Sequence, residues 1–175
     1  MYVLDIALSH VDRHVYESLA LRVPMHPSES AEYFVARVLA YCLEYTDGIA
    51  FSRGVSDADE PTIAVRDLTG ALKAWIEIGA PDAARVHKAS KAAPRVTIYT
   101  HKDPAAVRRA FVGERIYRAE SITLHAIDRD LIDEIVARLD RRLKLEITVT
   151  EGTLYVTIDG AVLTGDVVPY ALTDV

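Results

Sequence analysis

Residues 57–79 carry the side chains with the clearest potential for chemistry, which are Asp59, Glu60 and Glu77. Carboxylates that are held close together repel each other unless protons or a cation separate them. Carboxylate oxygens are also the ligands that Mg²⁺ and Mn²⁺ prefer in proteins. If the fold gathers these three acids, a divalent metal is the functional explanation. The alternative is a solvated acidic loop beside a single edge carboxylate.

A β-hairpin is the element that would bring these acids together. Apolar runs on both sides of Asp67–Gly70 predict two strands, because Asp at the first and Gly at the fourth position favour a type I turn. If Val65 pairs with Leu72, Glu60 lies opposite Glu77 at the open end of the hairpin. The turn lies about 20 Å away at ~3.3 Å per residue. We therefore interpret its aspartate as a turn residue and not as part of the site.

Basic side chains follow the hairpin on a predicted helix over residues 82–92. Arg85, Lys88 and Lys91 recur every three residues, so they share one face of this helix. Between residues 82 and 109 there are seven Lys or Arg and two Asp, in a chain with a formal net charge of −6. Such a local excess could steer a phosphate backbone, whereas the alternative is an ordinary solvated helix face.

Length and composition predict a globular protein of one domain, because the chain has 175 residues and 50% of them are hydrophobic. No apolar run approaches the ~20 residues of a membrane helix, so no membrane span is expected. The start of the chain lacks the features of a signal peptide, and the single Cys42 cannot form an internal disulfide. Both observations fit a reducing cytoplasm. Nothing in the pattern indicates an oligomeric state.

The remaining pattern predicts a mixed α/β fold. From residue 28 onward the order is helix, three strands, helix and strand, which packs naturally as a mixed sheet with helices on both faces. His10 and His14 flank the first turn, and we interpret them as surface residues and not as metal ligands. The other predicted elements are strands 2–9 and 16–23, a helix from 28 to about 45, strands 49–52, 95–99 and 121–127, a short helix after 104, a helix from 128 to about 143, and a final hairpin of 144–150 and 154–158.

Several motifs together resemble the YaeQ family. They occur in the family's order and spacing over most of the chain, and they are HPSE (26–29), Arg37–Ala40, DEP (59–61), DLTG (67–70), WIEIG (75–79), and Lys88-Ala89 before a strand that ends in Tyr99. The resemblance implies a protein of poorly defined function. It also implies a restriction-endonuclease-like (PD-(D/E)XK) core with extra N- and C-terminal hairpins, in a single domain over residues 1–175.

The resemblance implies a metal-dependent phosphodiesterase that acts on nucleic acid. Glu77 with Glu60 or Asp59 would hold Mg²⁺ or Mn²⁺, and the metal would activate the attacking water. Lys88 would be the catalytic lysine, moved to the helix after the hairpin, and would neutralise charge on the phosphate oxygens. Glu32 would orient this lysine or complete the metal shell.

One residue departs from the family pattern. The main metal-binding aspartate is expected at position 62, where this chain has threonine. A hydroxyl cannot replace a carboxylate as an anionic ligand of Mg²⁺. The alternative is therefore a non-catalytic member that binds nucleic acid or a protein, with Arg85 and Lys91 as contacts to a polyanion.

Overall fold

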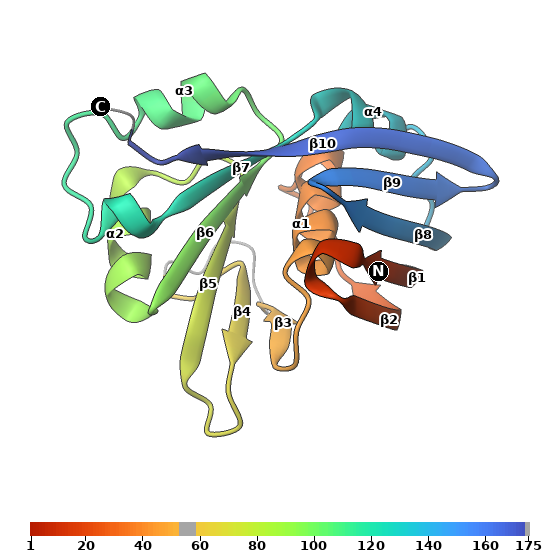
Figure 1. The fold of residues 1–175 in the computed structure, drawn as a ribbon, viewed down its shortest axis with the longest axis horizontal. Helices are drawn as coiled ribbons and strands as arrows, with labels where there is room; N and C mark the ends of the chain where they lie inside the picture. Colours follow the sequence, from red (N-terminus) through yellow and green to blue (C-terminus); the bar gives the residue numbers. More distant parts are fainter. Residues whose placement is uncertain (53–58, 174–175) are drawn as a thin grey trace. The chain divides into compact units, whose positions relative to one another are not determined.

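The computed structural model describes residues 1–52 and 59–173, so the first two residues of the predicted acidic stretch lie outside the described residues (Figure 1). The chain divides into two compact units, residues 1–35 with 127–168 and residues 36–126 with 169–175. Each unit contains β-strands and helical segments, which confirms the predicted mixed α/β class. The expectation of a single domain stays a prediction. No helix in the described part of the chain is long and apolar enough to cross a membrane.

The first unit is built on strands in the order β2-β1-β8-β9-β10. Their bounds are β1 Tyr2–His10, β2 Val15–Val23, β8 Arg142–Thr150, β9 Thr153–Ile158 and β10 Ala161–Ala171. The hairpins β1–β2 and β8–β9 are both antiparallel, as predicted, and β1 runs parallel to β8. Strand β10 was not predicted from the sequence. It pairs with β9, and its last residues, 169–171, belong to the second unit.

Helix α4 (Arg129–Val136) of the first unit is shorter than predicted, because the helical pattern was expected to continue to Leu143. The chain instead enters β8 at Arg142, where side chains alternate between exposed and buried positions. Asp128 caps the helix by accepting a hydrogen bond from the N–H of Asp130 at 3.0 Å.

Two further predictions in the first unit are corrected. His10 is buried at the end of β1, whereas it was expected on the surface; His14 is exposed, after the short helix η1 (Val11–Arg13). The first long helix, α1 (Ala31–Leu43), begins later than the HPSE motif suggests. His26 and Ser28 instead bond to each other in a turn, and Ser30 Oγ accepts the N–H of Tyr33 at 3.0 Å.

The second unit contains strands in the order β7-β6-β5-β4-β3, with an antiparallel meander of β3–β5 followed by parallel β6 and β7. The bounds of its elements are β3 Ile49–Phe51, β4 Ile63–Arg66, β5 Leu72–Ile78, α2 Ala83–Ala92, β6 Arg95–Thr100, α3 Pro104–Arg109, η2 Ala119–Ser121 and β7 Thr123–Ile127. Because α1 precedes β3, the predicted order of helix, three strands, helix and strand is confirmed.

The sheet of the second unit has two faces with different side chains. Trp75 and Ile98 pack with Val86 of α2 in one buried cluster, and Figure 1 shows α2 beside β5 and β6. Because side chains alternate along a strand, Glu77 lies on the same face as Trp75. Tyr99 lies on the opposite face, one position after Ile98.

Candidate functional site

The hairpin of β4 and β5 has a different register from the predicted one. Ile63 pairs with Ile76, two residues beyond the expected partner, and the ladder is irregular near the turn. If this register is continued to the open end of the hairpin, Thr62 lies opposite Glu77, in the position that was expected for Glu60. A shift of two residues keeps every side chain on its face of the sheet, so the alternation of the strands is the same in both registers.

Asp67 is confirmed as a turn residue. Its Oδ1 accepts the hydroxyl of Thr69 at 2.6 Å, the N–H of Thr69 at 2.9 Å and the N–H of Ala71 at 3.0 Å. The Thr69 hydroxyl and the Ala71 amide lower the pKa of Asp67 to about 2. These bonds stabilise the turn by which β4 leads into β5.

Glu77 is buried, with 3% of its surface exposed, and its carboxylate is held by three side chains. Arg85 donates from Nη2 to Oε1 at 2.8 Å and from Nε to Oε2 at 2.9 Å. The indole N–H of Trp75 donates to Oε1 at 2.7 Å. Thr62 donates to the same oxygen from its hydroxyl at 3.2 Å and from its backbone N–H at 3.4 Å. The two-pronged arginine contact neutralises the buried charge.

Arg85 also connects the segments around Glu77. Its Nη2 donates to the backbone oxygen of Glu60 at 2.8 Å, and its guanidinium lies 5.4 Å from the centre of the Trp75 ring. The backbone N–H of Arg85 donates to Asp82, which caps α2. The residue expected as a nucleic-acid contact thus has its guanidinium engaged inside the protein.

The described residues do not gather the three predicted metal ligands. Asp59 pairs with the ammonium group of Lys88, and the hydrogen bond and charge of Lys88 lower the pKa of Asp59. Glu60 contributes its backbone carbonyl to Arg85. Across residues 1–52 and 59–173, no group of three His, Cys, Asp or Glu could hold a metal ion. Glu77, Arg85 and the Glu60 carbonyl instead form one polar network, the Glu77 network, and Asp59, the residue before Glu60, pairs with Lys88.

The donor set at Glu77 does not fit a divalent metal in this arrangement. Mg²⁺ binds anionic oxygens that leave room for water in an octahedral shell. Both oxygens of Glu77 already accept hydrogen bonds from Arg85, and the residue opposite, Thr62, offers a neutral hydroxyl. Arg85 supplies the positive charge that a metal would otherwise supply.

Among the contacts of the described residues, two other predicted site residues lie outside this network. Glu32 lies in the first turn of α1 and belongs to the first unit, whereas the Glu77 network belongs to the second. Lys91 lies in the last turn of α2 and is exposed. The roles expected for Glu32 in catalysis and for Lys91 in nucleic-acid binding stay predictions.

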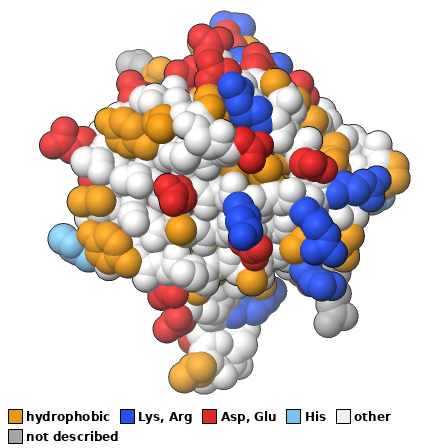
Figure 2. All heavy atoms as spheres, turned by 90° about the vertical axis from the view of Figure 1, so that its right-hand side faces the viewer, with side chains coloured by type: hydrophobic (Ala, Val, Ile, Leu, Met, Phe, Trp, Pro, Cys, Tyr) orange, Lys and Arg blue, Asp and Glu red, His pale blue; other side chains and the backbone are white. Residues whose placement is uncertain are grey.

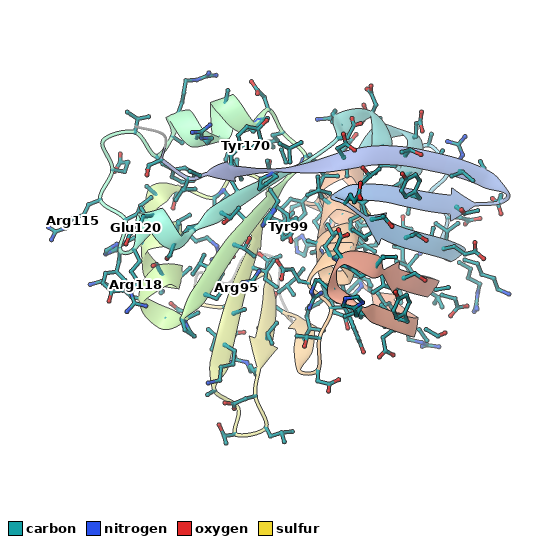
Figure 3. The ribbon with its side chains drawn as sticks, in the orientation of Figure 1. Arg95, Tyr99, Arg115, Arg118, Glu120 and Tyr170 are labelled. Atoms are coloured by element: carbon teal, nitrogen blue, oxygen red, sulfur yellow. The ribbon has the colours of Figure 1, made fainter. Side chains whose placement is uncertain are left out.

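A second buried glutamate, which the sequence analysis missed, lies on the opposite face of the same sheet. Glu44 follows α1, and its Oε1 accepts hydrogen bonds from Arg95 Nη2 at 2.9 Å and from the Tyr99 hydroxyl at 2.7 Å. The ring of Tyr99 stacks on His125 with 4.5 Å between ring centres. Figure 3 shows Arg95 and Tyr99 at different positions along β6.

Burial and neighbouring charges set the protonation states of this second cluster. Burial raises the pKa of Glu44, but the hydrogen bonds and charge of Arg95 and Tyr99 outweigh it, so the pKa is lowered overall. The same contact raises the pKa of Arg95. Burial lowers the pKa of His125. The cluster therefore pairs a carboxylate with a guanidinium beside an imidazole that favours its neutral form.

A signal for Glu44 was present in the sequence. An acid directly after the last residues of a helix faces the negative end of the helix dipole, which is unfavourable without a cationic partner. Arg95, at the start of an apolar β-branched run, is such a cation. Local spacing could not pair the two residues, because the fold joins them across the sheet.

Comparisons with known proteins give one consistent result. The family model described as YaeQ protein matches residues 1–166. "Uncharacterized protein YaeQ" of Escherichia coli (strain K12) is 27% identical over 161 residues, which cover 91% of this chain and 88% of that protein. The crystal structure of YaeQ protein from Pseudomonas syringae matches with a TM-score of 0.88 and 29% identity, covering 96% of this chain and 93% of that chain. The YaeQ protein structure from Xanthomonas axonopodis pv. citri matches with a TM-score of 0.86 and 25% identity, covering 96% of both chains.

Proposed function

This chain belongs to the YaeQ family, and from that premise we propose that it binds nucleic acid without metal-dependent catalysis. One observation carries the second half of the proposal: the carboxylate of Glu77 is bound on both oxygens by Arg85, with Thr62 in the opposite strand position. The relatives are described only as uncharacterized, so the proposal rests on the chemistry of the site.

The scaffold in this proposal is a restriction-endonuclease-like core. Its support is the order α1, three strands, α2 and β6, with Glu77 on the third strand and Lys88 on the following helix. On such a scaffold Thr62 and Arg85 replace a site for a divalent cation with an internal ion pair. The fold would then be kept for binding and not for hydrolysis.

The distribution of charge limits where nucleic acid could bind. The formal net charge of −6 disfavours a polyanion over most of the surface. On the face drawn in Figure 2, Lys and Arg side chains lie among Asp and Glu side chains and form no uniformly basic area. Binding would therefore use a limited strip, for which the last turn of α2 with Lys91 and the connection between α3 and β7 with Arg115 and Arg118 offer exposed cations.

A metal-dependent phosphodiesterase that uses Mg²⁺ or Mn²⁺ is the competing candidate. It is favoured by the position of the Asp59–Lys88 pair, because Asp59 precedes Glu60 in the chain and the Glu60 carbonyl binds the same Arg85 that holds Glu77. It requires the hydrogen bonds between Arg85 and Glu77 to break. The buried carboxylate of Glu77 would then have to be neutralised by the bound metal cation.

Two measurements separate these candidates. Titration calorimetry with Mg²⁺ and with Mn²⁺ is expected to show no specific heat of binding for the natural chain. Labelled DNA and RNA are expected to bind in a salt-sensitive way and to remain uncut with either cation. Cleavage that needs a divalent cation and disappears in the Glu77→Gln variant would overturn the proposal in favour of the phosphodiesterase.

A charge variant tests the binding half of the proposal. Lys91→Gln is expected to weaken binding of all sequences and to reduce the steepness of the salt dependence by about one ion. Lys144→Gln is a matched control, because this lysine is also exposed but lies on β8 in the first unit. Equal effects of both variants would show that the contact is general attraction and not a site.

A further inference from the structure

The connection between α3 and β7, residues 110–122, holds an exposed aromatic ring in a fixed position. Tyr117 is 43% exposed, whereas the preceding Ile116 is buried in the core cluster that includes Val86 of α2. The N–H of Tyr117 donates to Nδ1 of His87 at 3.0 Å, and its carbonyl accepts the hydroxyl of Ser90. Both partners belong to α2, so the backbone that carries the ring is attached to the helix at two points.

The next residue has an unusual backbone conformation. Arg118 has φ 53° and ψ 38°, in the left-handed region that few residues other than glycine adopt. Its carbonyl accepts the N–H of Ser121 at 2.9 Å and the Ser121 hydroxyl at 2.8 Å. Its guanidinium lies 5.1 Å from the centre of the Tyr117 ring. Such strain persists where surrounding contacts fix the chain, and it is often found at binding sites.

Other cations in this part of the chain are exposed. Lys91 lies in the last turn of α2, and Figure 3 shows Arg115 and Arg118 at the periphery of the second unit. In the part of the chain that the structure describes, neither Lys91 nor Arg115 forms a salt bridge, unlike Arg85 and Lys88. Two exposed acids of the same connection, Glu114 and Glu120, limit its net positive charge. Charge alone would therefore be a weak source of affinity for a polyanion here.

This combination of a ring and cations matches the chemistry of an unpaired base. A nucleobase in a single strand offers a π-face to an aromatic side chain, whereas bases in a duplex are already stacked on each other. We infer that Tyr117 is a stacking platform for a base of single-stranded nucleic acid, with Arg118, Lys91 and Arg115 as cations for the adjoining phosphates. The inference rests on the proposed function and names its substrate class and its central contact.

Variants of Tyr117 test the platform through fluorescence anisotropy of labelled oligothymidylate and oligouridylate strands with the full chain. Tyr117→Ala is expected to weaken binding about tenfold, and Tyr117→Leu to do nearly the same, because stacking on one ring contributes that much. Tyr117→Phe keeps the π-face and should bind like the natural chain. Tyr155→Ala is the matched control, since Tyr155 is 41% exposed on β9 and should not affect binding.

Variants of His87 test whether the platform depends on its attachment to α2. His87→Ala removes the acceptor for the Tyr117 N–H and should weaken binding of single strands several-fold. The unfolding temperature should fall by less than it does after a substitution in the core. His87→Asn offers an amide oxygen near the position of Nδ1 and should restore binding. A loss in His87→Ala that His87→Asn does not reverse would overturn this positioning role.

The possible results distinguish the inference from the function on which it rests. If the natural chain binds none of the nucleic acid probes, the proposed function itself is overturned. The same holds if Tyr117 is found to bind a protein and no nucleic acid. If the natural chain binds single strands but Tyr117→Ala and Tyr117→Leu bind equally well, only the platform is overturned. Duplex binding as tight as single-strand binding, or an equal loss in Tyr117→Phe, would also overturn the stacking contact.

Discussion

Two buried glutamates on opposite faces of one sheet are each held by an arginine and an aromatic donor, yet their surroundings differ. Arg85 binds both oxygens of Glu77 and has 24% of its side chain exposed. Arg95 reaches one oxygen of Glu44 and has 53% of its side chain exposed. The closest nitrogen–oxygen distances are 2.8 Å and 2.9 Å, so bond length does not distinguish the pairs. The difference in shielding from water should determine their contributions to stability.

The largest expected effect is that of Arg85→Met. The variant leaves the carboxylate of Glu77 buried without its cation, and loss of one partner of a buried pair costs about 3 kcal/mol. Urea denaturation measures this loss of unfolding free energy. The double variant Arg85→Met/Glu77→Gln removes the unpaired charge and should recover a large part of the loss. No recovery would mean that packing of the arginine, and not its charge, matters.

Tyr99→Phe should cost less. It removes one donor to the Glu44 carboxylate while Arg95 stays in place, and a hydrogen bond to a charged group contributes about 1.5 kcal/mol. The same denaturation experiment applies, with Tyr155→Phe as a control because that tyrosine is exposed on β9. A Tyr99→Phe variant as stable as the natural chain would mean that water replaces the phenol at Glu44.

Arg95→Met tests the comparison directly, because it is the counterpart of Arg85→Met on the other face. Its guanidinium is half exposed and Glu44 keeps the Tyr99 hydroxyl, so we expect a loss of about 1 kcal/mol or less. The loss should shrink further at high salt, whereas that of Arg85→Met should change little. Equal losses in the two variants would contradict the role assigned to shielding.

The smallest effect is a pH dependence from His125. Burial lowers the pKa of His125 below its ordinary value of 6.5. At a pH between the folded and the unfolded pKa, the unfolded chain therefore binds a proton that the folded chain does not. The resulting stability is fully present above that value and falls as the pH drops from 6.5 toward the folded pKa. His125→Phe keeps a ring against Tyr99 but cannot titrate. The difference in unfolding temperature between the natural chain and His125→Phe should therefore change between about pH 8 and about pH 5. A constant difference would contradict this account.

The sequence predicted the β4–β5 hairpin correctly, but not its register. A register shift of two residues preserves the alternation of apolar and polar side chains, so the pattern cannot detect it. The observed pairing includes an irregularity near the turn, between Val65 and Arg66, which the amino-acid composition does not indicate. Thr62 was recognised as a departure from the family pattern, but its bond to Glu77 became visible only with the observed pairing.

The Glu44 cluster was missed for a different reason. Each of its members has an ordinary local explanation, such as a helix end or the start of a strand, and they meet only because the fold sets α1 against β6. Spacing arguments find groups on one element or in one hairpin, as they did for Arg85 and Lys88. They do not find partners that lie on elements separated by three strands and a helix, as α1 and β6 are.

The chain contains one tryptophan, and its indole N–H is bonded to Glu77. Fluorescence that is excited at wavelengths absorbed by tryptophan but not by tyrosine therefore originates beside the Glu77–Arg85 pair. Any event that separates the pair or admits water to the ring should move the emission to longer wavelengths, so the natural protein carries its own optical reporter of that position.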